Sequence, residues 1–258
     1  MAIKICLDAG HYGQYNHSPA VKSYCESEMN WKLHNKLADA LKAYGIEVIK
    51  TRAELDKDLG LQARGKTAKG CDLFLSIHSN AVGSRVDENV DYVVVYVPLN
   101  GSGDAIGKKL AECIATTMGT KQKPYTKTRK SENGNWDYYG VINGAVSVGV
   151  PGLILEHSFH TNTKMTNWLL NDANLDKMAL AEAKVIAEHY GLTKVTETPA
   201  EKPAETPAAK PVETPAENTQ EVMYFVQCGA YSKLENAKNK VAALKAAGFD
   251  AIIKTEKK

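Results

Sequence analysis

The chain has 258 residues, of which 43% are hydrophobic, and it carries a formal net charge of +2 at neutral pH. That length is enough for one domain with a sizeable core and a smaller second unit. The near-neutral charge, without a Lys/Arg cluster, gives no support to a nucleic-acid partner, and no apolar run approaches the roughly 18 residues of a membrane helix.

Strand and helix signals alternate through the first three quarters of the chain. Short apolar runs predict strands at residues 3–7, 46–51, 72–77, 92–97 and 152–155. Apolar residues at helical spacing predict helices at 29–44, 104–118 and 174–190, and a more polar helix is expected at 61–69. This alternation favours an α/β domain, with a mostly parallel twisted sheet sandwiched by helices, over residues 1–192.

The remaining residues are expected to form a linker and a small module. Residues 193–221 have a proline at every fourth position from Pro199 to Pro215 and contain no aromatic residue, Leu, Ile or Met. Such a segment cannot bury a core, so it is interpreted as a semi-extended tether. Residues 222–258 predict a βαβ module. It is shorter than the roughly 40 residues at which single domains become hard to stabilise unaided, and an oligomer formed through it is one expected consequence.

The cysteines and the N-terminus indicate where the chain is made. The five cysteines are odd in number and form no Cys-x-x-Cys pair, so we expect free thiols and no zinc held by cysteine. No secretory signal is recognisable at the N-terminus. We therefore expect synthesis in the cytoplasm.

Polar residues that suit metal chemistry follow several of the predicted strands. His11 comes directly after the first strand, His78 follows a later one, and Glu156 ends a short buried strand. The carboxyl ends of parallel strands share one edge of a sheet, so these side chains can meet in space. Glu26 and Glu28 offer a further carboxylate where the first long helix begins. A His/Glu/His set leaves zinc one open position for water, and another carboxylate must then act as general base.

Each of these residues also has a structural interpretation. A lone histidine at a strand end is more often hydrogen-bonded than metal-bound, whereas an unpaired carboxylate on a buried strand costs several kcal/mol and is harder to explain. His157 and His160 flank Glu156, and spacing alone leaves them open as ligands. The remaining histidines are expected at the surface: His17, His34 and His189. Two arginines, Arg52 and Arg64, are expected to pair with carboxylates in structural roles.

These motifs resemble those of the zinc-dependent N-acetylmuramoyl-L-alanine amidases of the amidase-3 family. The matching positions, in order, are Asp8-Ala9-Gly10-His11, Glu26, Asn30, Gly45, Thr51-Arg52, Ser76 to Ala81, Glu156, Phe159 and Asn162. The resemblance implies that His11, Glu26 and His78 are zinc ligands and that Glu156 is the catalytic carboxylate. Ala9 stands where the family usually has Pro or Gly, and residues 12–24 lack its glycine-rich run, so the groove near the metal is expected to differ in shape.

The resemblance implies zinc-dependent hydrolysis of the amide between N-acetylmuramic acid and L-alanine in peptidoglycan. Asn80 is predicted either to hydrogen-bond the substrate or to orient a ligand. The segment 133–140, which includes Tyr139, is either a packed surface loop or a wall for the stem peptide. A metallopeptidase or carboxypeptidase with the same metal set is the alternative enzyme. A wall-binding protein without chemistry is disfavoured, because all four predicted metal and catalytic positions are filled.

Residues 224–232 resemble the start of a SPOR repeat, a peptidoglycan glycan-binding unit that normally has two βαβ halves. Only one half is present, and a solubilising or dimerising tail is the alternative interpretation. A phage endolysin typically has a catalytic domain, a tether and a short wall-binding module in this order. Such an enzyme is made in the cytoplasm and acts at the bacterial cell wall after the membrane has been permeabilised. A host autolysin of the same chemistry is the alternative.

Overall fold

The computed structural model describes residues 2–195 and, beyond them, residues 234, 237–238, 240–241 and 252–253. The chain separates into two units, Met1–Glu201 and Lys202–Lys258. Most of the predicted linker and module lies outside the described residues, so the three domain limits stay predictions. In the described part of the chain, no helix combines the length and apolar character that a bilayer crossing requires.

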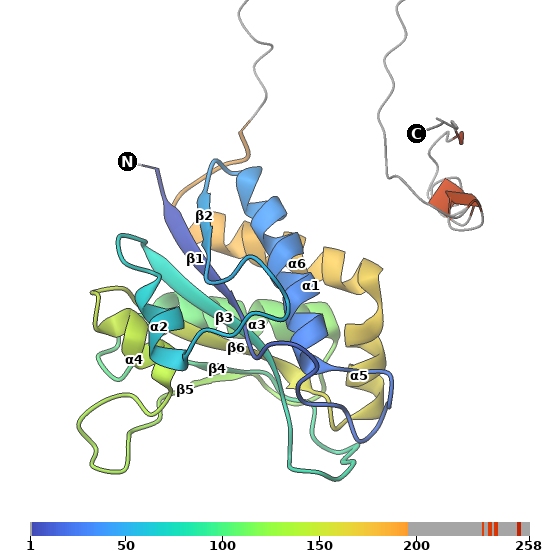
Figure 1. Cartoon of the computed structure of the whole chain (residues 1–258), viewed down its shortest axis with the longest axis horizontal. Helices are drawn as coiled ribbons and strands as arrows, with labels where there is room; N and C mark the ends of the chain where they lie inside the picture. Colours follow the sequence, from blue (N-terminus) through green and yellow to red (C-terminus); the bar gives the residue numbers. More distant parts are fainter. Residues whose placement is uncertain (1, 196–233, 235–236, 239, 242–251, 254–258) are drawn as a thin grey trace, which may run out of the picture. The chain divides into compact units, whose positions relative to one another are not determined.

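The described part of the first unit contains one six-stranded sheet with helices (Figure 1). The strands are β1 (Lys4–Ala9), β2 (Glu47–Lys50), β3 (Leu73–Asn80), β4 (Val94–Tyr96), β5 (Tyr125–Lys127) and β6 (Gly152–Phe159). The helices are α1 (Glu26–Lys42), α2 (Leu61–Lys66), α3 (Asp104–Met118), α4 (Gly140–Val146), α5 (Thr163–Leu170) and α6 (Asp172–His189). The strand order is β2-β1-β3-β6-β4-β5, and β4 pairs antiparallel with β6 while the other pairs are parallel. The predicted α/β fold with a mostly parallel sheet is confirmed.

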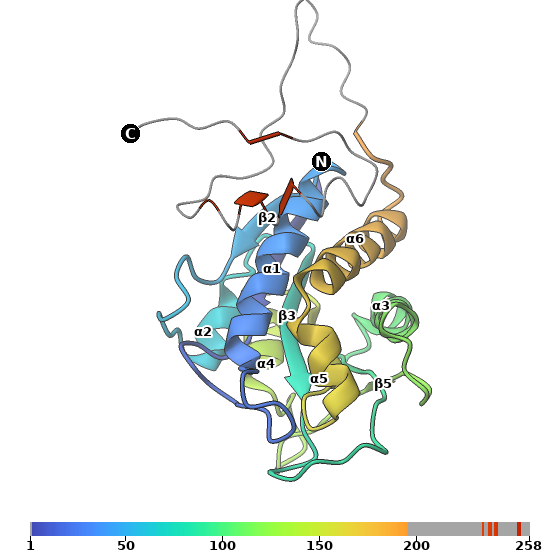
Figure 2. The same cartoon turned by 90° about the vertical axis from the view of Figure 1, so that its right-hand side faces the viewer.

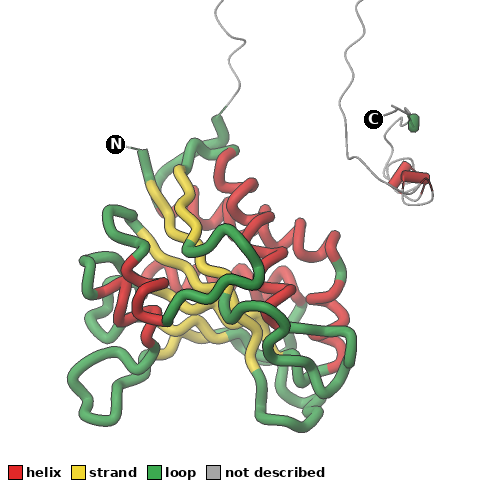
Figure 3. Tube along the Cα trace, viewed as in Figure 1, coloured by secondary structure: helices red, strands yellow, loops and turns green. Residues whose placement is uncertain are grey.

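Different helices cover the two faces of the sheet (Figures 2 and 3). Alternate residues of a strand point to opposite faces. Ile5 and Leu7 accordingly belong to a large core with α1, α3, α5 and α6, and Cys6 belongs to a smaller core with α4. The face with the smaller core also carries α2. This helix packs so closely against α4 that a Cβ on Gly65 would lie 2.1 Å from the Val141 carbonyl oxygen. Arg64, which precedes Gly65 on α2, donates hydrogen bonds to Asp8 and Ala9 at the end of β1.

The structure differs from the predicted elements at several places that bear on the site. β3 and β6 run past their predicted ends, so Glu156 lies inside β6 rather than at its end. β3 and β6 stay paired beyond Glu156, with a shift in register between His78 and Asn80. The polar side chains in this region do not prevent the backbone pairing. The prediction of a surface position for His34 is wrong: its side chain is 1% exposed on α1, with Nδ1 2.6 Å from the Trp31 carbonyl oxygen. The described cysteines Cys6, Cys25, Cys71 and Cys113 form no disulfide.

Candidate metal centre

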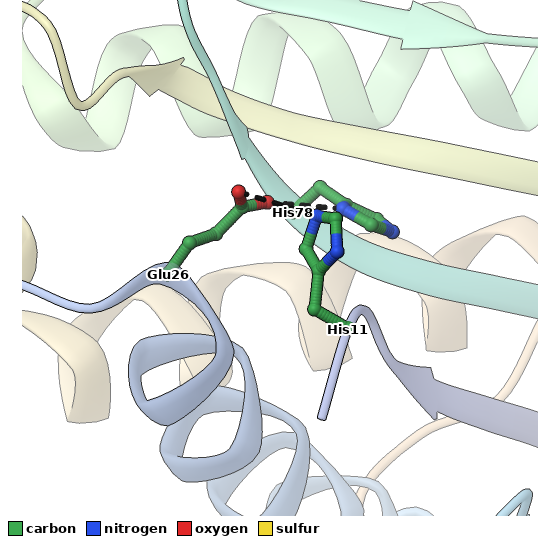
Figure 4. A group of neighbouring side chains, drawn as sticks. All are labelled: His11, Glu26 and His78. Carbon is green, nitrogen blue, oxygen red and sulfur yellow. Dashed lines mark hydrogen bonds and ion pairs between the residues drawn. The ribbon is translucent and has the colours of Figure 1, made fainter. Parts of the chain in front are cut away.

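Three side chains from three separate elements converge at the carboxyl end of the sheet (Figure 4). His11 lies in the loop after β1, Glu26 is the first residue of α1, and His78 lies on β3. Glu26 Oε1 is 3.0 Å from His78 Nδ1, and its Oε2 is 3.3 Å from His11 Nε2. The candidate ligand atoms all lie within 4.8 Å of one another, and no other such group occurs among the described residues.

The donor set fits a zinc ion. Ligand atoms at about 2.0–2.2 Å in a tetrahedral site lie roughly 3.4 Å apart, close to both Glu–His distances. The Glu26 side chain is only 2% exposed, whereas those of His11 and His78 are 27% and 17% exposed. The buried carboxylate therefore anchors the cluster and the imidazoles face solvent, as a site that must admit water and substrate requires.

The surroundings of Glu26 keep its carboxyl group ionised. Burial alone would raise its pKa, but the hydrogen bonds with His11 and His78 outweigh burial and hold the pKa well below its usual range. The Ser79 backbone N–H donates to Oε1 (3.1 Å), and Asn16 Nδ2 donates to Oε2 (2.8 Å). A metal-binding carboxylate must be deprotonated, so these bonds prepare Glu26 for that role.

Gly10 and Asp8 shape the pocket of His78. A Cβ on Gly10 would lie 2.2 Å from atoms of the His78 ring, so only glycine fits beneath the imidazole. The second ring nitrogen of His78 is 3.1 Å from Ser76 Oγ, and that hydroxyl donates to Asp8 Oδ2 (2.6 Å). The Asp-x-Gly-His motif thus supplies one candidate ligand, His11, and the space for the other, His78. It also supplies the Asp8 carboxylate, which accepts from the hydroxyl beside the His78 ring.

Two arginines hold the backbone of His11, the first candidate ligand. His11 adopts a left-handed conformation with φ of 60°, which is unfavourable for a residue with a side chain. Arg52 and Arg64 each donate to the carbonyl oxygens of both Ala9 and His11, at 2.8–3.0 Å. Arg64 also lies 3.3 Å from Asp8 Oδ1. Arg64 also pairs with the Asp58 carboxylate at 2.9 Å, so the predicted pairing with carboxylates holds for Arg64. Arg52 bonds to carbonyl oxygens among the described residues.

Glu156 lies directly across the sheet from His78. The two residues pair in the β3–β6 register, so their side chains share the face that carries α2 and α4. Among the described residues, Glu156 Oε2 has no hydrogen-bond partner although that atom is buried. Burial, and then the charge of Glu26, raise the pKa of the Glu156 carboxyl well above its usual range. A carboxyl group with a raised pKa is a candidate for proton transfer.

The two predicted substrate-binding residues lie near this face. Asn80 is two residues beyond His78 on β3, and its Oδ1 accepts the Ala81 backbone N–H (2.8 Å). Tyr139 precedes α4, and its ring centroid is 4.6 Å from that of Tyr96 on β4. Burial, Tyr139 and Glu156 raise the pKa of Tyr96. Tyr139 and Tyr96 are thus placed on the Glu156 side of the sheet, and their contact with substrate stays a prediction.

The histidines that flank Glu156 lie elsewhere. His157 points to the opposite face, where its Nε2 is 3.0 Å from Glu182 Oε1. His160 Nδ1 is 2.9 Å from Ser79 Oγ, and its ring stacks on Tyr24. Neither joins the cluster, and neither does Glu28.

Sequence reasoning missed the contacts of Asn16 and Ser76 with the cluster, and the hydrogen bond from Ser76 to Asp8 behind it. Asp8 and Ser76 carried a usable signal, because each is a polar residue within an otherwise apolar strand. Asn16 lies in a loop, and only the path of that loop brings its Nδ2 to within 3.1 Å of His11 Nε2.

Known proteins share this architecture. The family model for N-acetylmuramoyl-L-alanine amidase matches residues 5–188, and the SPOR domain model matches residues 222–258. N-acetylmuramoyl-L-alanine amidase CwlM from Bacillus licheniformis is 25% identical over 256 residues, which cover 97% of this chain and 84% of that protein.

Solved structures share the fold. Cwp6 from Clostridium difficile has a TM-score of 0.61 at 23% identity, over 73% of this chain but only 29% of the Cwp6 chain. The catalytic domain of CwlV, an N-acetylmuramoyl-L-alanine amidase from Bacillus (Paenibacillus) polymyxa var. colistinus, has a TM-score of 0.61 at 21% identity, over 74% of this chain and 99% of that domain.

Proposed function

The chain belongs to the N-acetylmuramoyl-L-alanine amidase family, and on that premise we propose that it hydrolyses peptidoglycan with a zinc ion held by His11, Glu26 and His78. The match confirms the predicted family resemblance and the amidase activity. The metal and the residue roles are the proposal. The observation that carries it is the His/Glu/His cluster opposite Glu156 on the neighbouring strand, whose Oε2 is buried without a hydrogen-bond partner among the described residues.

The proposed reaction adds water across the amide between the lactyl group of N-acetylmuramic acid and L-alanine. Zinc, when bound, would supply Lewis-acid chemistry that polarises the carbonyl and acidifies water. Glu156 takes the proton of the attacking water and then delivers a proton to the alanine nitrogen as the C–N bond breaks. The products are a lactyl carboxylate and a stem peptide with a free amino terminus. The raised pKa of Glu156 serves both proton transfers.

Asn80 and Tyr139 are proposed to bind the substrate on either side of Glu156. Asn80 extends from the strand that carries His78, and Tyr139 lies against Tyr96. Substitution of either residue by alanine should raise KM more than it lowers kcat, because neither side chain is assigned a proton-transfer role. A fall in kcat with unchanged KM would contradict this assignment.

A turbidity assay on purified Gram-positive cell walls tests the proposed chemistry. Wild type should clear the walls, lose activity with a chelator and recover it when zinc is added back. Glu156→Gln should bind zinc and fold, yet fail to clear the walls. Activity that survives both chelation and Glu156→Gln would overturn the proposal. Release of D-alanine instead of new L-alanine amino termini would favour the carboxypeptidase alternative.

The narrower proposed role is that of a phage endolysin. Its support is the presence, on one chain, of an amidase match, a Pro-rich segment and a SPOR match. Removal of residues 193–258 should weaken attachment to walls and leave the cleavage of soluble wall fragments intact. A gene located among phage structural and membrane-permeabilising genes would support the endolysin role, whereas a gene among bacterial wall-remodelling genes would favour the autolysin alternative.

A further inference from the structure

A buried ion pair lies behind the metal cluster, on the opposite face of the sheet. His157 of β6 and Glu182 of α6 are both 0% exposed, and His157 Nε2 is 3.0 Å from Glu182 Oε1. Burying two charged groups costs desolvation energy, and an apolar pair of similar volume is often at least as stable. The pair therefore needs an explanation other than stability.

The second nitrogen of His157 connects the pair to a proposed metal ligand. His157 Nδ1 lies 3.0 Å from the backbone carbonyl oxygen of His78 and 3.2 Å from that of Leu155. Carbonyl and carboxylate oxygens only accept hydrogen bonds, so both ring nitrogens must donate. His157 thus joins the Glu182 carboxylate to the peptide group of His78 through charge-assisted hydrogen bonds.

This contact falls where the β3–β6 ladder is irregular. The pairing register shifts between His78 and Asn80, and Ser158 has a left-handed φ of 57°. Irregularities of this kind commonly redirect side chains beside active sites. His157 belongs to β6 and follows Glu156 in the chain, and its ring bonds to the His78 carbonyl of β3. It therefore links the two strands at the register shift.

We propose that His157, oriented by Glu182, is a positioning residue that fixes the backbone of His78 and thereby the direction of its imidazole towards the metal. This inference rests on the proposed metal site. Residues that orient a metal ligand without touching the metal typically contribute 10–100-fold in metal affinity. Loss of the pair should therefore weaken zinc binding even where the fold is preserved.

The test compares His157→Leu/Glu182→Met with wild type and with Glu188→Gln, an exposed control on the same helix. Urea unfolding of the metal-free proteins, zinc affinity by chelator competition, and the visible spectrum of the Co²⁺-substituted proteins would be measured. We expect the double variant to unfold at a urea concentration no lower than wild type, bind zinc about 10–100-fold more weakly and show a shifted Co²⁺ spectrum. The control should match wild type in all three measurements.

A stable double variant with wild-type zinc affinity and an unchanged Co²⁺ spectrum would overturn the proposal. Glu182→Gln provides a second test, since it keeps the side-chain shape and removes the charge that orients His157. It should weaken zinc binding several-fold, and unchanged affinity would likewise overturn the proposal. If wild type itself bound no zinc, the metal site would be refuted as well, so the two failures are distinguishable.

Discussion

Replacing Glu156 by methionine should lower activity and raise stability at the same time. Glu156 Oε2 is buried without a hydrogen-bond partner, and burial raises the pKa of the carboxyl group well above its usual range. The fold therefore disfavours the ionised side chain at neutral pH. An unsatisfied buried polar group costs about 1–3 kcal/mol, so Glu156→Met should stabilise the metal-free protein by about that amount. For a domain of this size the melting temperature should rise by about 2–12 °C.

The stability gain should depend on pH with a definite sign. A carboxyl group with a raised folded-state pKa destabilises the fold increasingly as the pH rises from its unfolded value, about 4.3, through the folded value. The advantage of Glu156→Met should therefore be largest above the folded-state pKa and shrink as the pH falls towards about 4. Thermal melts of the chelated proteins across this range measure the effect.

Activity should move in the opposite direction. Loss of the proposed acid–base group should lower kcat on a soluble muropeptide by about 10²–10⁴-fold, with zinc affinity near that of wild type. Glu112→Met, on the exposed side of α3, is the matched control and should change stability by less than about 0.5 kcal/mol. A Glu156→Met protein that is less stable than wild type, or that keeps the wild-type kcat, would refute the reasoning.

Three further substitutions probe the fold and the ligand geometry. Burial lowers the pKa of His34 to about 4, so stability should fall by about 3 kcal/mol as the pH drops from about 6.5 towards 4. Urea unfolding of His34→Leu should show a smaller decline, and an equal decline would contradict the assignment. Arg64→Met leaves Asp8 buried without its cation and should cost about 3–5 kcal/mol in urea unfolding, whereas a change below about 1 kcal/mol would count against the arginine contacts. Gly10→Ala forces a Cβ against the His78 ring and should weaken zinc binding at least about tenfold in chelator competition; wild-type affinity would show that the ring can move freely.

Sequence patterns predicted the fold where one physical signal dominated. The helix predicted at residues 104–118 has those limits in the structure, because its apolar spacing is regular and Gly119 ends it in a left-handed conformation. α4 was missed because two of its seven residues are glycine, which disfavours helix formation. Tertiary packing requires a glycine at position 144, because a Cβ there would lie 2.3 Å from the Gln62 carbonyl oxygen of α2.

The ends of parallel strands indicated that His11 and His78 could meet at one edge of the sheet, but that argument left Glu28, His157 and His160 open as ligands. The choice of His11, Glu26 and His78 came from the family resemblance. His78 lies on β3 and His11 just follows β1, while Glu26 begins the helix that follows. Other features of the site depend on contacts that no local pattern encodes. The two-arginine support of His11 requires the loop after β2, which carries Arg52, and α2, which carries Arg64, to pack against the end of β1.

Identification of the bond that is cut is the most informative measurement on this protein. Peptidoglycan would be digested with wild type, with chelated protein and with chelated protein restored by zinc, and the new amino-terminal residues would be labelled and identified. We predict new amino-terminal L-alanine with wild type, its loss on chelation and its return with zinc. Cleavage that yields no amino-terminal L-alanine, or L-alanine release that is indifferent to chelation, would contradict zinc-dependent amidase chemistry at the His11–Glu26–His78 site.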